Sequence, residues 1–473
     1  MSSGPDPSPT LWARAVATID DPRPRSVVAV TLLALVVLPI IGLLAVTAGQ
    51  LADDEAILDE VTSAISAGRL TEEYVPRSMS GRFIDVWTDC HTITIGSVDT
   101  AGASPWSVAL RNPTLGNCGR MVPHVEAWTA GGELSPHFDY FRYWHGTTSV
   151  TRPLIATVGL EATRIVTAWV LVAAIAAFCW SFARRQGVIV TAALIGPFAL
   201  TGDVLDLPGS LHQAWALSVA LVGAVVAHEA VYRRRTPGRI MLSTVIAGAV
   251  FSFFDVLTIP PGVWALTVFV VAAAATRHVR GWALAGTAAL ATFGWMLGFG
   301  WMWAAKWALS IPIYGVDEVR DEVVEQTTFR LDGEPGWEID LSFGASWTRM
   351  RDLWFLHGLT KPVLWALIIL VIVVLVKRAR AAGAQSLLER WPDRLVMLTP
   401  ALLVPVWFEI LRNHTQIHTF PLKSVPIAVG IVAAAFLVRL SPIERTPPST
   451  EAATTSASPP VDADAPDPAS TRR

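Results

Sequence analysis

The sequence predicts an all-α polytopic membrane protein with about ten transmembrane helices. Of its 473 residues, 52% are hydrophobic and only 16% are charged, whereas soluble domains carry roughly 25% charged residues. Apolar runs recur at close to the length of about 20 residues that a helix needs to cross a bilayer. Lys and Arg gather in alternate connections between these runs. Together these observations predict repeated membrane crossings.

Hydropathy places the first predicted span at residues 26–49. It is too long for the apolar region of a signal peptide and no small-residue cleavage site follows it, so we expect a retained anchor. The other nine predicted spans cover residues 164–182, 188–205, 213–231, 240–258, 262–276, 282–309, 361–377, 394–411 and 422–439.

Charge asymmetry predicts the orientation of the spans. Two short hairpins, around Asp206-Leu-Pro-Gly and Ile259-Pro-Pro-Gly, contain no Lys or Arg. The positive-inside rule therefore predicts cytoplasmic N- and C-termini in a bacterial plasma membrane. The basic residues of the opposite connections include Arg184, Arg185, Arg233, Arg234, Arg235, Arg239, Arg277, Arg280, Lys377, Arg378, Arg380, Arg390 and Arg394.

This topology divides the chain into segments. An acidic amphipathic stretch, 51–70, opens the first large outer loop and is expected to form a helix along the membrane surface. The tail is rich in Pro, Ser, Thr, Ala and Asp, a composition that cannot bury a core and predicts disorder. The segments are a cytoplasmic start (1–25), the first span (26–49), an outer loop domain (50–163), a bundle (164–309), a second outer loop (310–360), a final bundle (361–440) with an outer turn (412–423), and a cytoplasmic tail (441–473).

Two of the three cysteines, Cys90 and Cys118, lie in the first outer loop. An extracytoplasmic loop would allow them to form a disulfide. The alternative is a pair of unrelated buried thiols.

The same loop supplies candidate catalytic carboxylates. Asp85 and Asp89 are four residues apart, so a helix would present both on one face. A carboxylate near the outer membrane surface is suited to act as general base for a sugar hydroxyl. Solvated or helix-capping carboxylates are the alternative.

Several cationic residues are candidates for binding phosphate. Arg142, His145 and Arg152 end the first outer loop, where they could clamp a phosphate at headgroup level; an interfacial aromatic belt is the alternative. Asp255 and Lys306 lie near the outer ends of two spans and could pair with each other in an outward-facing cavity.

The outer turn 412–423 is the densest polar cluster beside a predicted span, which makes it a candidate site. Asn413, His414, His418 and Lys423 suit a phosphate-binding wall. The two histidines also have the spacing that holds a metal on a helix, but the sequence shows no third ligand. The sequence identifies no cofactor; it allows a divalent metal ion but does not require one. The alternative is a polar turn capped by Pro421.

Some of these motifs occur in a recognisable combination. Tyr143-Trp-His145-Gly with Arg152-Pro-Leu, Phe254-Asp255-Val-Leu-Thr, the segment ending at Lys306-Trp, and Asn413-His414 with Ile-His418 resemble a set in uncharacterised bacterial polytopic membrane proteins. This resemblance spans most of the chain and brings no activity with it.

The topology also resembles that of GT-C glycosyltransferases. That resemblance implies a polyprenyl-phosphate sugar donor, an envelope polysaccharide or protein acceptor, and a catalytic carboxylate in the first outer loop. The first outer loop offers Asp85, Asp89 and Asp139 as candidates, without the adjacent Asp-Glu pair of some subfamilies. Asp89 is the preferred base and Asp85 the second choice. Lipids are expected partners and nucleic acids are not.

Two other function classes stay open. A transporter or flippase for a lipid-linked or anionic envelope precursor would use Asp255 and Lys306 as charges along its pathway. A non-enzymatic envelope-assembly protein would use neither the carboxylates nor the histidines for chemistry.

Overall fold

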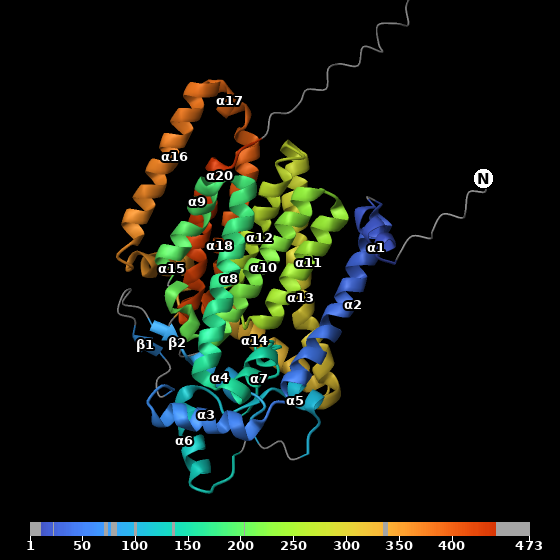
Figure 1. Ribbon diagram of the computed structural model, residues 1–473, viewed down its shortest axis with the longest axis vertical. Coiled ribbons are helices and arrows are strands. Elements are labelled where there is room, and N and C mark those ends of the chain that lie inside the picture. Colours follow the sequence, from blue (N-terminus) through green and yellow to red (C-terminus); the bar gives the residue numbers. More distant parts are fainter. Residues whose placement is uncertain are drawn as a thin grey trace, which may run out of the picture. The chain divides into compact units, whose positions relative to one another are not determined.

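The computed structural model describes residues 11–21, 23–70, 74–76, 83–98, 102–134, 138–202, 204–333 and 339–440. The tail 441–473, predicted to be disordered, lies outside these residues. The described chain is almost entirely helical, with two short antiparallel strand pairs (Figure 1). The predicted all-α class is therefore confirmed.

Seven helices are long and apolar enough to cross a membrane. Helices also form at the other three predicted spans, but two are shorter and the third has Asp393 and Arg394 in its first turn. The seven are α2 (Pro24–Gly49), α8 (Leu160–Gln186), α10 (Leu211–Arg233), α11 (Pro237–Phe254), α13 (Gly281–Tyr314), α16 (Thr360–Ala382) and α20 (Ser424–Leu437) with η2 (Phe420–Lys423); the other three are α9 (Val188–Thr201), α12 (Pro260–Ala275) and α18 (Trp391–Ile410).

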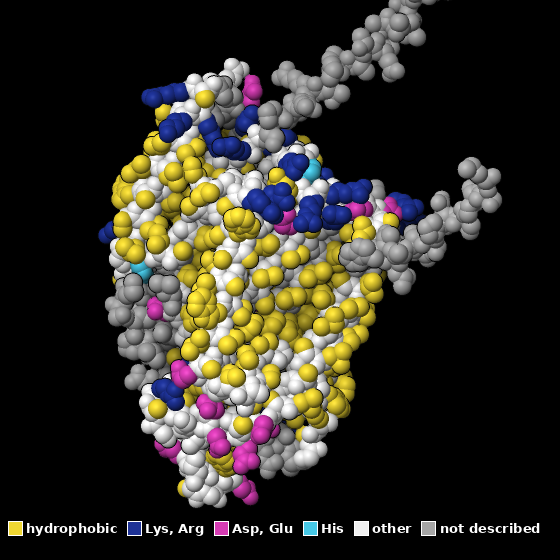
Figure 2. Space-filling view, viewed as in Figure 1, with side chains coloured by type: hydrophobic (Ala, Val, Ile, Leu, Met, Phe, Trp, Pro, Cys, Tyr) yellow, Lys and Arg dark blue, Asp and Glu magenta, His cyan; other side chains and the backbone are white. Residues whose placement is uncertain are grey.

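These helices run alternately in opposite directions, so their connections gather at two ends of the bundle (Figure 1). One end, here called the arginine end, carries Arg184, Arg233 and Arg277. Figure 2 shows Lys and Arg side chains concentrated at this end, while acidic side chains gather at the other. The opposite end holds the described residues between 50 and 159 and is called the disulfide end.

Glycines allow close packing in the bundle. Helices α11 and α13 meet at Gly248, Gly294 and Gly298. A Cβ atom at Gly248 would lie 2.1 Å from the carbonyl oxygen of Trp295, and one at Gly298 would lie 2.1 Å from that of Val245. Such close backbone approach is how membrane helices gain van der Waals contact without a hydrophobic driving force.

The disulfide end carries a small layered domain. Its first helix, α3, crosses the direction of the bundle helices in Figure 1 and is capped by Asp53, whose side chain accepts from the backbone N–H groups of Glu55 and Ala56. The domain contains α3 (Asp54–Ser66), β1 (Tyr74–Pro76), β2 (Phe83–Asp85), α4 (Trp87–Thr94), α5 (Pro105–Arg111), β3 (Pro113–Thr114), α6 (Cys118–Thr129), β4 (Phe138–Asp139) and α7 (Thr148–Val158), with β1 paired to β2 and β3 to β4.

Cys90 and Cys118, the predicted pair, form a disulfide that joins α4 to the start of α6, with a Cα–Cα distance of 5.2 Å. Both cysteines belong to a buried apolar cluster with Ile57, Val61 and Met121. The cluster also includes Leu211, the first residue of α10. The domain core is therefore continuous with the end of a membrane helix.

The remaining helices lie before α2 or in the connections between the long helices of the bundle. They are α1 (Leu11–Asp20), η1 (Val204–Gly209), α14 (Val316–Asp332), α15 (Ala345–Phe355), α17 (Ala384–Glu389) and α19 (Arg412–Ile417). The predicted outer turn 412–423 thus contains α19 and η2.

Candidate functional site

Asp89, the preferred catalytic base, caps the N-terminus of α10. Its carboxylate accepts hydrogen bonds from the backbone N–H groups of Leu211 at 2.9 Å and His212 at 3.2 Å, and from Ser210 Oγ at 3.4 Å. The side chain is fully buried. A carboxylate at this position compensates free helix N–H groups and the positive end of the helix dipole. These contacts are those of a positioning residue.

The expectation that Asp85 and Asp89 share a helix face is wrong. Asp85 ends strand β2, whereas Asp89 lies in α4, and Val86 separates the two elements. The side chain of Asp85 lies outside the described part of the structure.

Arg152, expected to bind phosphate, is a buried clamp within the domain. Its guanidinium donates to the carbonyl oxygens of Gly49 at 3.1 Å and Ile95 at 2.5 Å, to Ser97 Oγ at 2.7 Å, and to Asp54. These bonds tie the end of α2 to α3 and α7. The guanidinium is thereby committed to structure rather than to a ligand.

Asp255 and Lys306 do not pair with each other. Asp255 accepts from the backbone N–H and the hydroxyl of Thr258, within the turn between α11 and α12. Lys306 is fully buried and donates to the carbonyl oxygens of Ala109 and Leu110, both at 2.9 Å. A cation there compensates the last carbonyls of α5.

Helix α19 fastens several elements together. Asn413 Nδ2 donates to Phe329 O at 2.7 Å on α14, and Gln416 Nε2 donates to Asp340 O at 2.7 Å and Ser346 Oγ at 3.2 Å. His414 Nε2 lies 2.9 Å from Leu257 O in the α11–α12 turn. Most of the cluster's polar groups therefore bond to protein.

His414 and His418 do not share one helix, because α19 ends at Ile417 and His418 has extended backbone. Their rings still meet at 4.8 Å, and His418 stacks on Phe420 at 4.5 Å. Within the described residues, no group of three or more His, Cys, Asp or Glu side chains could hold a metal ion. Lys423, the last predicted phosphate ligand here, donates to Gln213 Oε1 at 2.6 Å.

His145 lies in a cluster of aromatic side chains that includes Tyr140 and Tyr143. It is buried with φ of 52°, and neither ring nitrogen has a hydrogen-bond partner among the described residues. Its ring lies 4.8 Å from that of Tyr140 and 5.8 Å from that of Tyr143. Burial keeps the pKa of His145 well below its usual value, so the imidazole is neutral at neutral pH.

The neighbours of His145 in its motif dock against the bundle. Trp144 Nε1 donates to Met302 O at 2.6 Å, and the N–H of Gly146 donates to Phe253 O at 2.8 Å. A Cβ atom at Gly146 would lie 2.4 Å from the Phe253 ring, so only glycine fits. The Tyr-Trp-His-Gly motif therefore has a packing function.

Arg142 and Arg330 link the aromatic cluster around His145 to helix α14. The Arg142 guanidinium lies over the Tyr140 ring at 4.5 Å and bonds to Glu322 Oε1 at 3.0 Å. Arg330, on α14, donates to the Tyr143 hydroxyl at 2.7 Å. The positive charge of Arg330 also contributes to the lowered pKa values of His414 and His418, after burial. The sequence gives no signal for Arg330, because it is one of two arginines among the many acidic residues of α14.

The most exceptional polar group is Glu409, near the end of α18. Both of its carboxylate oxygens are shielded from solvent and have no hydrogen-bond partner among the described residues. An uncompensated buried carboxylate is costly, so it marks a candidate site. Sequence offers only a weak signal for it, since a carboxylate at the end of an apolar helix is normally a cap or solvated.

An apolar groove runs along the same helix as Glu409. It has a volume of about 510 Å³, lies between α16, α18 and α20, and is lined on α18 by Ala401, Leu402 and Pro405. Helix periodicity places Glu409 on the same stripe, one turn beyond Pro405. Trp347 lines the groove and packs against Phe408, with ring centroids 6.2 Å apart. Glu409 therefore lies one turn beyond the groove lining, toward the disulfide end.

Arg412 follows Glu409 by three residues and begins α19, after α18 has ended at Ile410. Its Nε donates to Glu409 O at 3.0 Å and its Nη1 to Leu341 O at 2.8 Å. Its Nη2 has no hydrogen-bond partner in the part of the chain that is described. A carboxylate and a guanidinium that still has donor capacity thus follow the groove-lining residues of α18.

Comparisons of the chain with protein-family models, with curated proteins and with solved structures find no match.

Asp89→Asn is predicted to destabilise the protein. The amide nitrogen cannot accept a hydrogen bond, so one N–H of α10 loses its partner and the helix loses a compensating charge. We expect the free energy of unfolding to fall by about 1–3 kcal/mol. Thermal unfolding in detergent measures this, with the exposed Asp59→Asn as the matched control. An unchanged unfolding midpoint would contradict the capping role.

Stability is predicted to decrease on mild acidification because His418 is buried in its neutral form. Burial, with a smaller contribution from Arg330, lowers the pKa of His418 from its usual 6.5 to about 4. Between these pH values the unfolded chain binds a proton that the folded protein does not, so folding weakens as pH falls.

Thermal unfolding midpoints between pH 7 and pH 4 test this expectation. His418→Gln should flatten the decrease, whereas the same change at the exposed His278 should leave it as in the wild type. Equal pH dependence in wild type and His418→Gln would contradict the assignment.

Proposed function

We propose that the protein is an integral membrane transferase of the GT-C glycosyltransferase type, acting on a polyprenyl-phosphate-linked sugar at its disulfide end. The observation that carries the proposal is an apolar groove with Glu409 one helical turn beyond its lining residue Pro405, a carboxylate that has no hydrogen-bond partner among the described residues. The groove suits the lipid chain of the donor, because its lining is apolar along three membrane helices. The lipid's polar head would then lie beside α15 and α19.

Glu409 replaces Asp89 as our preferred general base. It would take the proton from an acceptor hydroxyl as that oxygen attacks the anomeric carbon, and the bond between this carbon and the phosphate oxygen breaks. The leaving polyprenyl phosphate gains negative charge, which the remaining donor of Arg412 would stabilise. Asp89 then acts only by positioning α10.

We propose ten membrane crossings with both termini in the cytoplasm of a bacterial cell. The location of the arginines at one end supports this orientation. A disulfide at the other end also fits an extracytoplasmic, oxidising compartment. The acceptor would accordingly be an envelope polysaccharide or protein.

The transporter alternative has less support. It relied on Asp255 and Lys306 as charges available to a moving substrate, but both are engaged by hydrogen bonds within the protein. An envelope-assembly function without chemistry would leave the unpartnered carboxylate of Glu409 unexplained.

Glu409→Gln is predicted to reduce sugar transfer by about 10²–10⁴-fold, the usual contribution of a general base. The test incubates purified, reconstituted protein with a panel of radiolabelled polyprenyl-phosphate sugars and envelope extract, and measures label in the acceptor. The exposed Glu318→Gln on α14 is the matched control and should retain full transfer.

The unfolding midpoint of the same variant separates catalysis from folding. Because the Glu409 carboxylate has no hydrogen-bond partner among the described residues to lose, the isosteric amide should preserve or raise the midpoint. Full transfer by Glu409→Gln would refute the assignment of the base, as would a loss of transfer that only accompanies unfolding.

A further inference from the structure

A second apolar groove runs along α8, α10 and α11. It has a volume of about 570 Å³, within the range of about 300–1,000 Å³ typical of small-molecule sites. Ala177 on α8, Val226 on α10 and Ser243 on α11 line the part of the groove nearest the arginine end. Figure 2 shows apolar surface beneath the band of basic side chains in the region of these helices.

Helix register brings arginines to this end of the groove. Arg184 follows Ala177 by seven residues and Arg233 follows Val226 by seven, so each continues the groove-lining stripe of its helix. Side chains of a helix lean toward its N-terminus, and α8 and α10 both run toward the arginine end. Arg184 and Arg233 therefore lean back toward the groove.

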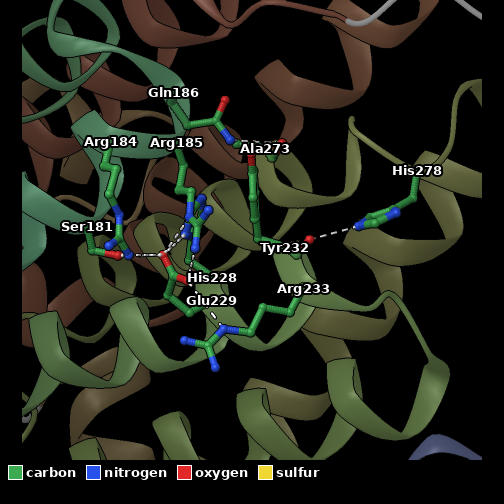
Figure 3. Close-up of polar contacts among 10 residues, drawn as sticks. All are labelled: Ser181, Arg184, Arg185, Gln186, His228, Glu229, Tyr232, Arg233, Ala273 and His278. Carbon is green, nitrogen blue, oxygen red and sulfur yellow. Dashed lines mark hydrogen bonds and ion pairs between the residues drawn. The ribbon is translucent and has the colours of Figure 1, made fainter.

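Glu229 gathers these arginines into one cluster (Figure 3). Arg185 holds it tightly, with Nε at 3.2 Å and Nη2 at 2.9 Å, and Ser181 Oγ donates to it at 2.9 Å. Arg184 and Arg233 are held more loosely, at 3.6 Å and 3.7 Å. Their side chains are 52% and 70% exposed, so they can accept another anion.

The cluster has an excess of positive charge. Three guanidinium groups, those of Arg184, Arg185 and Arg233, face the single carboxylate of Glu229. Arg185 is also stacked on Tyr232, with its Cζ 4.4 Å from the ring centroid. Two loosely held positive charges thus lie at the end of an apolar groove, an arrangement complementary to one phosphate with an attached hydrocarbon chain.

We propose that this groove binds one anionic phospholipid from the leaflet at the arginine end. An acyl chain occupies the groove between α8, α10 and α11, and the phosphate lies between Arg184 and Arg233, with Glu229 holding the two guanidiniums in place. This site is separate from the groove at α16, α18 and α20, and does not depend on the proposed transferase function.

Native mass spectrometry of protein released from nanodiscs tests the proposal. Nanodiscs containing equal amounts of phosphatidylglycerol and phosphatidylethanolamine should yield wild-type protein that retains phosphatidylglycerol preferentially. Replacing both Arg184 and Arg233 by Ala should lower its retention roughly 30-fold, since each basic residue contributes about 1 kcal/mol near a membrane surface. Ala177→Phe, which fills the groove, should also lower retention while leaving the charges unchanged.

Two matched controls make the result specific. Arg25→Ala removes an exposed charge on α2, near the arginine end, and Ala176→Phe adds the same bulk to an exposed position of α8 that does not line the groove. Both controls should retain phosphatidylglycerol as the wild type does. Equal retention of the two lipids by wild-type protein would overturn the proposal, as would equal losses in controls and groove variants.

Discussion

The hydrogen bonds that Asp89 accepts from the N-terminus of α10 determine how the helix bundle and the disulfide-end domain fit together. A membrane helix that begins inside protein leaves several N–H groups without water or intrahelical partners. Asp89 supplies the compensation from a separate element, α4, and the adjacent Cys90 joins that element to α6 through the disulfide. The position of α10 is thus coupled to the core of the disulfide-end domain.

The same physical requirement accounts for much of the polar character of this end. Lys306 compensates the carbonyls that end α5, Arg152 joins three segments, and Asn413, His414 and Gln416 bond to backbone carbonyls. Irregular backbone near a membrane must find such partners, because an unsatisfied group in a dry environment costs several kcal/mol. Polar density alone is therefore a poor guide to function here, and polar groups without partners are a better one.

The sequence correctly predicted the helical class and helices at the predicted spans, because the hydropathy of each segment is a local property. It also predicted the disulfide partners, because only two of the three cysteines lie in the first outer loop. It failed for Asp85 and Asp89, where an element boundary at Val86 replaced the expected continuous helix. It also failed for Asp255 and Lys306, whose partners are a nearby turn and a helix end distant in sequence. Glu409 became a candidate only because its buried carboxylate has no hydrogen-bond partner among the described residues, and no sequence pattern reveals such an absence.

The central claim is that the groove beside Glu409 holds a polyprenyl phosphate, and photocrosslinking from its wall tests this most directly. A benzoylphenylalanine at Leu402 would face the groove, while one at Val373, exposed on α16 and opposite the lining residues Leu364 and Val371, would face away from it. Mass spectrometry of the crosslinked lipids should identify polyprenyl phosphate at Leu402 and bulk phospholipid at Val373. The same bulk phospholipid at both positions would contradict the account.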